Sequence, residues 1–129
     1  MGYRAGFCMQ GDTNIAIGKC ALAGSTTKSN NTGSQNIAIG QDTADGLTSG
    51  GYNVFMGYQV ANSGTITGTN NVSIGCQTSR SLTSGADNIY IGRQAGDDNT
   101  TGDCQIYLGM WSGRYMRGDH NIALGCQAL

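Results

Sequence analysis

The sequence predicts an all-β chain, a parallel β-solenoid of seven to eight coils with roughly 17 residues per coil. The first observation is a frame, Gly-x-x-Asn-φ-x-φ-Gly with φ apolar, that occurs seven times along the chain. The second is the spacing of its closing glycines, which follow one another after 22, 17, 18, 17, 17 and 16 residues. The third is a short β-branched stretch in each copy, without the i, i+3, i+4 apolar spacing of a helix. Self-similarity at a fixed period is the signature of stacked repeats.

Glycine is the most regular feature of the repeat. The chain of 129 residues has 22 glycines and no proline. Most of the glycines hold the framing positions, so they mark turns in a repeat rather than a flexible tail. The closing glycines, which we expect at tight corners, are Gly18, Gly40, Gly57, Gly75, Gly92, Gly109 and Gly125.

The frame covers the chain from end to end. Residues 1–6 match the tail of a truncated eighth copy, and the chain stops four residues after Gly125. We therefore expect residues 1–129 to form a single solenoid domain. Because solenoids end in divergent capping repeats, we further expect an excerpt of a longer fibre, or subunits that stack end to end.

Each copy holds one strand of three residues. The first and third residues are always apolar, whereas the middle one varies from alanine to tyrosine. Alternation with a period of two predicts a strand with one face in the core. We expect the first and third residues to face inward and the middle one outward. The predicted strands are residues 15–17, 37–39, 54–56, 72–74, 89–91, 106–108 and 122–124.

Amide side chains recur at two positions of the repeat and predict ladders along the solenoid axis. Stacked amides hydrogen-bond from one layer to the next. Glutamine stands two residues after the closing glycine at Gln59, Gln77, Gln94 and Gln127. The frame amides, with glutamine as the one substitute, are Asn14, Asn36, Asn53, Asn71, Asn88, Gln105 and Asn121.

Large aromatic and sulfur-containing residues predict a contact surface. They occupy the strand centres at Phe55, Tyr90 and Tyr107 and follow closing glycines at Tyr58, Met110 and Trp111. An outward stripe of such residues on a chain this poor in charge is typical of an interface. We consider two uses, which are burial between identical chains and recognition of an external ligand such as a glycan.

Composition excludes several classes of function. Charged residues make up 12% of the chain and the net charge is −1, so no basic stripe exists to bind nucleic acid. No apolar run approaches the ~20 residues of a membrane span, and we expect no membrane insertion. The five cysteines stand at unlike positions of the repeat. This favours buried or half-buried free thiols and assembly in a reducing cytoplasm.

No pattern of catalytic or cofactor-binding residues stands out. His120 is the only histidine, and no nucleophile motif accompanies it. One frame position holds aspartate in three copies, at Asp12, Asp103 and Asp119. Stacked carboxylates of this kind can hold a Ca²⁺ ion. We favour the alternative, in which they are solvated turn residues. The glycines form no phosphate-binding or dinucleotide-binding motif. We expect no enzymatic activity, no cofactor and no metal.

The repeat also resembles known repeats. The sequence Gly-x-x-Asn-φ-Ala-Ile-Gly-x-x-Ala-Leu, nearly whole in residues 14–22 and 121–129, resembles repeats of bacteriophage tail fibres and viral surface appendages. It is also similar to the head repeats of trimeric autotransporter adhesins. These resemblances imply a homotrimeric parallel β-roll, which is left-handed in the adhesins. The period here is longer than in the adhesins, and their neck, stalk and anchor are missing.

Together these observations predict a structural fibre or appendage protein of a phage or virus. We expect it at a virion surface or in an extracellular appendage, self-associated as a homotrimer, by end-to-end stacking or both, and contributing to host attachment. The alternative is the head domain of a bacterial trimeric adhesin. A lesser alternative is an ice-binding solenoid, but the Thr-x-Thr rank of such proteins occurs only at residues 65–67.

Overall fold

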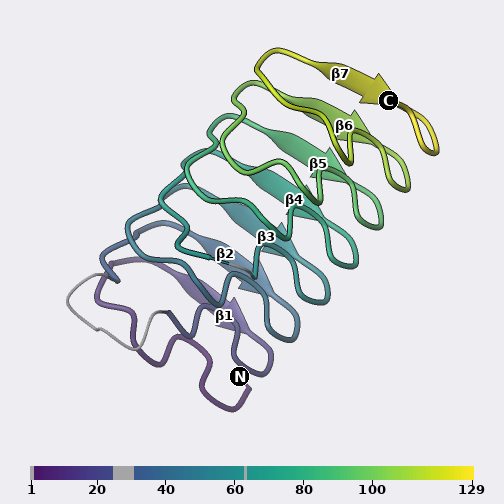
Figure 1. The fold of residues 1–129 in the computed structure, drawn as a ribbon. Coiled ribbons are helices and arrows are strands. Elements are labelled where there is room, and N and C mark those ends of the chain that lie inside the picture. Colours follow the sequence, from purple (N-terminus) through teal and green to yellow (C-terminus); the bar gives the residue numbers. More distant parts are fainter. Residues whose placement is uncertain (1, 25–30, 63) are drawn as a thin grey trace.

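The computed structural model describes residues 2–24, 31–62 and 64–129, which form a β-solenoid with seven parallel strands (Figure 1). The strands recur roughly every 17 residues, as predicted. Among these residues no helix is long and apolar enough to cross a membrane. The strands are β1 (Ile15–Ile17), β2 (Ile37–Ile39), β3 (Val54–Met56), β4 (Val72–Ile74), β5 (Ile89–Ile91), β6 (Ile106–Leu108) and β7 (Ile122–Leu124).

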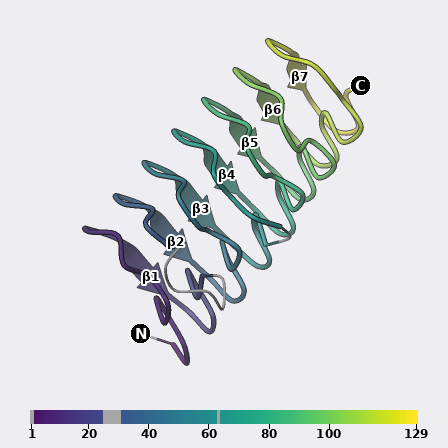
Figure 2. The same ribbon diagram turned by 60° about the vertical axis from the view of Figure 1, so that its left-hand side comes forward.

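The strands stack in chain order and in a constant register (Figure 2). Ile15 lies opposite Ile37 and Ala16 opposite Ala38, and the same pairing of equivalent positions continues to β7. The step of 22 residues between the first two closing glycines does not shift this register. The sequence predicts that the five additional residues of this step form a surface loop within Gly24 to Asn31, and residues 25–30 lie outside the described part of the chain.

The closing glycines are favoured by their backbone conformation and, in six of the seven copies, also by a lack of space. All seven have φ between +115° and +142°, where L-residues with a side chain are rare. From Gly18 to Gly109 there is no room for a side chain; a Cβ on Gly40, for example, would lie 1.8 Å from the carbonyl oxygen of Gly57. The corners after β1 to β6 therefore bring the backbones of successive coils into direct contact.

The strand faces are the reverse of the prediction. The strand centres Phe55, Tyr90 and Tyr107 are fully buried, whereas Ile15 and Ile17 are each 48% exposed. The expectation that the first and third strand residues face the core is therefore wrong. That prediction assigned the more apolar face of the strand to the interior, whereas the structure places the strand centres there.

The asparagine of the frame explains this orientation. Asn36 is buried and stands two residues before Ala38, so both side chains lie on the same face of the extended chain. Ala38 is also fully buried, so this face is the enclosed one. Ile37 and Ile39 are thereby placed on the convex outer face.

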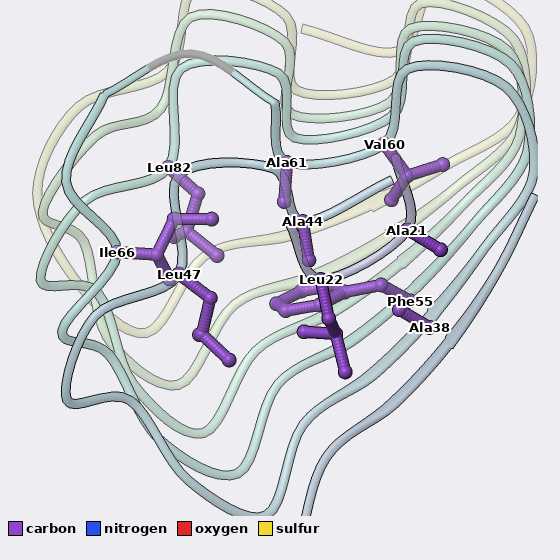
Figure 3. Packing of buried hydrophobic residues seen from close by; sticks show 10 residues of the cluster. All are labelled: Ala21, Leu22, Ala38, Ala44, Leu47, Phe55, Val60, Ala61, Ile66 and Leu82. Carbon is purple, nitrogen blue, oxygen red and sulfur yellow. The ribbon is translucent and has the colours of Figure 1, made fainter. Parts of the chain in front are cut away.

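The interior holds two separate apolar clusters. The lower cluster contains Leu22, Phe55 and Leu82 among ten buried residues, and the upper one is centred on Tyr90 and Tyr107. In Figure 3, side chains of the lower cluster converge from opposite walls of the coils. Backbone hydrogen bonds also join the coils along the wall opposite the strands, as from Thr48 N to the carbonyl of Ile66 at 3.0 Å.

Candidate functional site

The frame amides form a continuous hydrogen-bonded ladder inside the solenoid. Asn71 donates from its backbone N and from Nδ2 to Oδ1 of Asn53, at 2.9 and 3.1 Å. Its Nδ2 also donates to the carbonyl of Gly85 at 2.8 Å. The same bonds recur from Asn14 to Asn88, so each amide fixes the coil above it. Because these amides are bonded within the chain, the ladder is a structural element and presents no free groups to a ligand.

Gln105 replaces asparagine in this ladder and keeps it intact. Its backbone N donates to Oδ1 of Asn88, and its Oε1 accepts from the backbone N of Asn121, both at 2.9 Å. The same Oε1 accepts a hydrogen bond from the hydroxyl of Tyr107 at 2.8 Å. The longer glutamine thus connects the ladder to the upper cluster.

The outer face of the strands is an unbroken aliphatic surface, which we call the aliphatic face. Each of the seven strands contributes two outward side chains, and with a strand spacing of about 4.8 Å they extend over about 29 Å. Ile122 and Leu124 are 62% and 63% exposed, and the strands below are partly exposed. The aliphatic face consists of Ile15, Ile17, Ile37, Ile39, Val54, Met56, Val72, Ile74, Ile89, Ile91, Ile106, Leu108, Ile122 and Leu124.

The aromatic contact surface predicted from the sequence is not present as a single surface. Phe55, Tyr90 and Tyr107 lie in the core, because the strand centre is the inward position. Tyr90 and Tyr107 stack there with ring centroids 5.2 Å apart and an interplanar angle of 25°. Tyr58 is 45% exposed. Sequence reasoning missed the aliphatic face, which the position of the buried asparagine would have identified.

The turns that follow β5 and β6 bring arginine and aromatic side chains together. Asp97 is fully buried, and its Oδ1 lies 3.2 Å from Nε of Arg80 in the coil below. On the other side, Nε of Arg114 lies 4.0 Å from Oδ2 of Asp97. Burial raises the pKa of the Asp97 carboxyl, and the Arg80 guanidinium opposes this shift. The guanidinium carbons of Arg93 and Arg114 lie 5.3 and 5.9 Å from the ring centroid of Trp111.

The predicted glutamine ladder is present only in part. Gln77 Nε2 donates to Oε1 of Gln59 at 3.1 Å. One coil further on, Oε1 of Gln94 accepts a hydrogen bond from Nε1 of Trp111. Trp111 therefore takes the place of a glutamine at this position of the repeat. Its side chain and that of Met110 are half-buried.

Two of the three aspartates that share a frame position, Asp103 and Asp119, bond the backbone of the coil below. Within residues 2–24, 31–62 and 64–129, no three His, Cys, Asp or Glu side chains are grouped to hold a metal ion. Asp103 Oδ1 instead accepts from the backbone N of Ala86 at 2.7 Å, and Asp119 Oδ1 accepts from that of Asp103 at 3.0 Å. His120 is exposed.

All five cysteines are free thiols, and their exposure differs. Cys8 is buried and Cys20 is half-buried, as expected. Cys76, Cys104 and Cys126 are exposed, so the expectation of buried or half-buried thiols is wrong for these three. Their positions in the corners and turns of the repeat place them outside the core.

Comparison with protein-family models, with curated proteins and with solved structures finds no match to this chain.

Proposed function

We propose that this protein is a structural element of an extended appendage, a phage or viral fibre, in which identical chains associate through the aliphatic face. It acts by presenting host-attachment surfaces rather than by catalysis. The observation that supports this proposal is the aliphatic face, on which fourteen outward aliphatic or methionine side chains line up without interruption. Contiguous apolar patches on soluble monomers seldom exceed a few hundred Å² in area, and larger patches mark interfaces.

The occupant that best fits the aliphatic face is another copy of the same chain. The face repeats with the solenoid, so in a cyclic assembly around an axis parallel to the solenoid each side chain meets its own counterpart at the same height. Such an assembly is elongated along that axis, as a fibre requires. We propose three copies, because the repeat resembles those of trimeric fibres and adhesins.

The same face supports a fibre over an ice-binding solenoid. Its outward pairs are Ile, Val, Met and Leu, whereas an ice-binding surface needs ranks of threonine at one register. Thr65 and Thr67 are exposed, but on the wall opposite the strands. The head of a bacterial trimeric adhesin uses the same assembly and is the second candidate function. A downstream coiled coil and membrane-anchored barrel on the full-length chain would identify it.

The proposal is tested by measuring the mass of the purified chain with light scattering after size-exclusion chromatography. We expect a trimer at micromolar concentration and rod-shaped particles by electron microscopy. The double variant Ile74→Lys/Ile91→Lys places two charges on the aliphatic face and is expected to give monomers with an unchanged circular dichroism spectrum. Thr65→Lys, on the opposite wall, is the matched control and should remain a trimer. A monomeric wild-type chain would overturn the proposal, and a stable dimer would overturn the threefold arrangement.

A further inference from the structure

We propose that the two edges of the aliphatic face bind each other in neighbouring copies of the chain. The copies then run parallel, with equivalent strands at the same height. In this arrangement Arg93 pairs with Asp87 of the neighbouring copy, and Lys19 pairs with Asp12 of the neighbouring copy. The inference rests on the association proposed above and names the contacts that set its direction and register.

Turn residues on both sides of each strand form these edges (Figure 1). The leading edge consists of the two residues before each frame amide, which are residues 12–13, 34–35, 51–52, 69–70, 86–87, 103–104 and 119–120. The trailing edge consists of the two residues after each closing glycine, which are residues 19–20, 41–42, 58–59, 76–77, 93–94, 110–111 and 126–127. Rotation about an axis parallel to the solenoid places the leading edge of one copy beside the trailing edge of the next.

The two edges carry charges of opposite sign. The leading edge has no lysine or arginine and four aspartates, which are Asp12, Asp87, Asp103 and Asp119. The trailing edge has Lys19, Arg93 and a single aspartate, Asp42. Both cations, and the leading-edge aspartates beside the same two strands, are exposed and form no ion pair within the described residues. A second copy therefore supplies the opposite charges that each edge lacks within its own chain.

The charges beside β5 lie at matching heights on the two edges. Arg93 donates from Nη2 to Sδ of Met110 at 2.8 Å, so its guanidinium lies between the coils of β5 and β6. On the leading edge, Asp103 accepts from the backbone N of Ala86 at 2.7 Å, so its carboxylate lies between the same two coils. Asp87 is exposed at the level of β5. The neighbouring copy thus presents two carboxylates at the height of one guanidinium.

Two exposed tyrosines flank β3, midway between the two ion pairs. Tyr52, on the leading edge, is 62% exposed, and Tyr58, on the trailing edge, is 45% exposed. Exposed aromatic side chains are typical of interfaces between chains. With equivalent strands at the same height, the two rings meet across the interface and cover each other.

Other arrangements lose these contacts. In the proposed register Asp42 stands opposite uncharged residues beside β2, and its Oδ2 accepts a hydrogen bond from Gln41 at 3.0 Å. A shift by one coil in one direction sets Asp42 against Asp12, and the opposite shift moves Lys19 beside uncharged residues. An antiparallel pair brings like edges together, so that the aspartates of the leading edge face one another. These repulsions favour the parallel, unshifted arrangement.

Threefold closure brings the edges within reach of each other. Packed sheets stand ~10 Å apart, so three sheets that each lie ~5 Å from a common axis enclose a triangle about 17 Å on a side. The six steps of chain from Asp87 to Arg93 span at most about 20 Å. The width of the aliphatic face therefore matches the side of this triangle, and neighbouring edges meet at its corners.

The test exchanges the two charges beside β5. Asp87→Arg and Arg93→Asp each set like charges against one another at every interface of the trimer. We expect each single variant to raise the dissociation constant of the trimer by about tenfold or more, and the swapped variant Asp87→Arg/Arg93→Asp to return to within about threefold of the wild type. Sedimentation equilibrium over a dilution series at low salt measures these constants, and added salt should reduce the differences.

A mispaired variant is the matched control. Asp87→Arg/Lys19→Asp has the same net charge as the swapped variant, but it sets like charges together beside both β1 and β5. It should dissociate more readily than Asp87→Arg alone. If the substitutions beside β5 lower the melting temperature, the swap Lys19→Asp/Asp12→Lys repeats the test beside β1. A mispaired variant as tightly associated as the swapped one would overturn the pairing.

The same measurements separate this inference from the proposed function. Wild-type trimers whose association is unaffected by the single variants, or not restored by the swap, would overturn the edge contacts and leave the assembly standing. Dimers restored by the swap would overturn the threefold arrangement and leave the edge contacts standing. A wild-type chain that stays monomeric would overturn both.

Discussion

The lower and upper halves of the solenoid have the same backbone geometry but differ in the side chains of their cores. In the coils of β1 to β4 the core consists mainly of aliphatic residues such as Leu22, Leu47 and Leu82, with Phe55 as the largest member. In the coils of β5 and β6 two stacked tyrosines occupy the equivalent space, and Ala123 of β7 packs with them. The strand register and the amide ladder continue through both halves without change. The glycines and the amides therefore determine the backbone geometry of the coils, and the core side chains only need to fill the space inside them.

In several coils, volume is balanced between the strand centre and the residue six positions later, although the coil of β2 has alanine at both Ala38 and Ala44. Tyr107 is paired with Gly113, on which a Cβ would lie 2.5 Å from the tyrosine ring. Phe55 is paired with Ala61, whereas the small Ala16 is paired with Leu22. Ser73 and Ser79, between the two halves, are bonded to each other. Close packing of this kind explains how one coil geometry accepts both alanine and tyrosine at the strand centre.

The comparison depends first on Phe55 filling the lower half. Phe55→Ala should lower the free energy of unfolding by about 3–5 kcal/mol, because it removes a fully buried ring and leaves a cavity. Urea titration measures this loss. Ile91→Ala, on the aliphatic face, should destabilise the chain only through weaker association, so its effect disappears on dilution. If Ile91→Ala were as costly in the monomer as Phe55→Ala, the assignment of the two strand faces would be wrong.

The balance of volume in the upper half can be broken at Gly113. Gly113→Ala should cost about 1–3 kcal/mol through overpacking against Tyr107. The left-handed φ is not the main obstacle, since Ala61 has φ of +46° at the same position beside Phe55. Thermal unfolding of a double-mutant cycle with Tyr107→Ala should show that the cost of Gly113→Ala is largely relieved. Strictly additive effects would rule out the proposed compensation.

The two tyrosines of the upper half differ in their hydroxyl groups. Tyr107 donates to Gln105, whereas the buried hydroxyl of Tyr90 has no hydrogen-bond partner among the described residues. Tyr107→Phe should therefore cost about 1 kcal/mol, and Tyr90→Phe should be neutral or stabilising. Chemical denaturation of both variants checks the difference. A larger loss for Tyr90→Phe than for Tyr107→Phe would show that the upper cluster is held together differently.

The sequence alone predicts the all-β solenoid, its period and the strand positions, because glycine and asparagine recur at fixed distances. It also places the frame amides at one register, where the structure joins them in a ladder. The apolar alternation alone does not tell which face of each strand is buried, since a three-residue apolar strand alternates equally well in either orientation. Two other signals in the sequence contain that information. Asn36 stands an even number of residues from the strand centre, and Gly113 and Ala61 are small where Tyr107 and Phe55 are large.

The ion pairs and ring contacts in the turns after β4, β5 and β6 were not predicted, although Trp111 belongs to the expected contact surface. Arg80, Asp97 and Arg114 occupy the same position in three consecutive coils, so their alternating charges come together only once the coils are stacked. The repeat period is enough to predict that these three residues are neighbours. They were missed because the frame is defined by the constant positions of the repeat, whereas these residues stand at a variable one.

A double variant with almost no net effect is expected where the two halves meet. The hydroxyl of Ser79 donates to that of Ser73 at 2.8 Å, and both side chains are fully buried. Ser73→Ala alone should cost about 1–2 kcal/mol, because it leaves a buried hydroxyl without its partner. The double variant Ser73→Ala/Ser79→Ala removes both groups and should return to within about 0.5 kcal/mol of the wild type, since matched removal of a buried polar pair is nearly neutral.

Urea titration of the two single variants and the double variant measures the coupling between these serines. Thr101→Ala, at an exposed position of the upper half, is the control for a substitution without buried polar partners. If the double variant is nearly neutral, the serine pair is one more balanced filling of the coil, and the aliphatic and tyrosine clusters merge across it. A double variant less stable than either single variant would instead show that the polar pair holds the two halves in register.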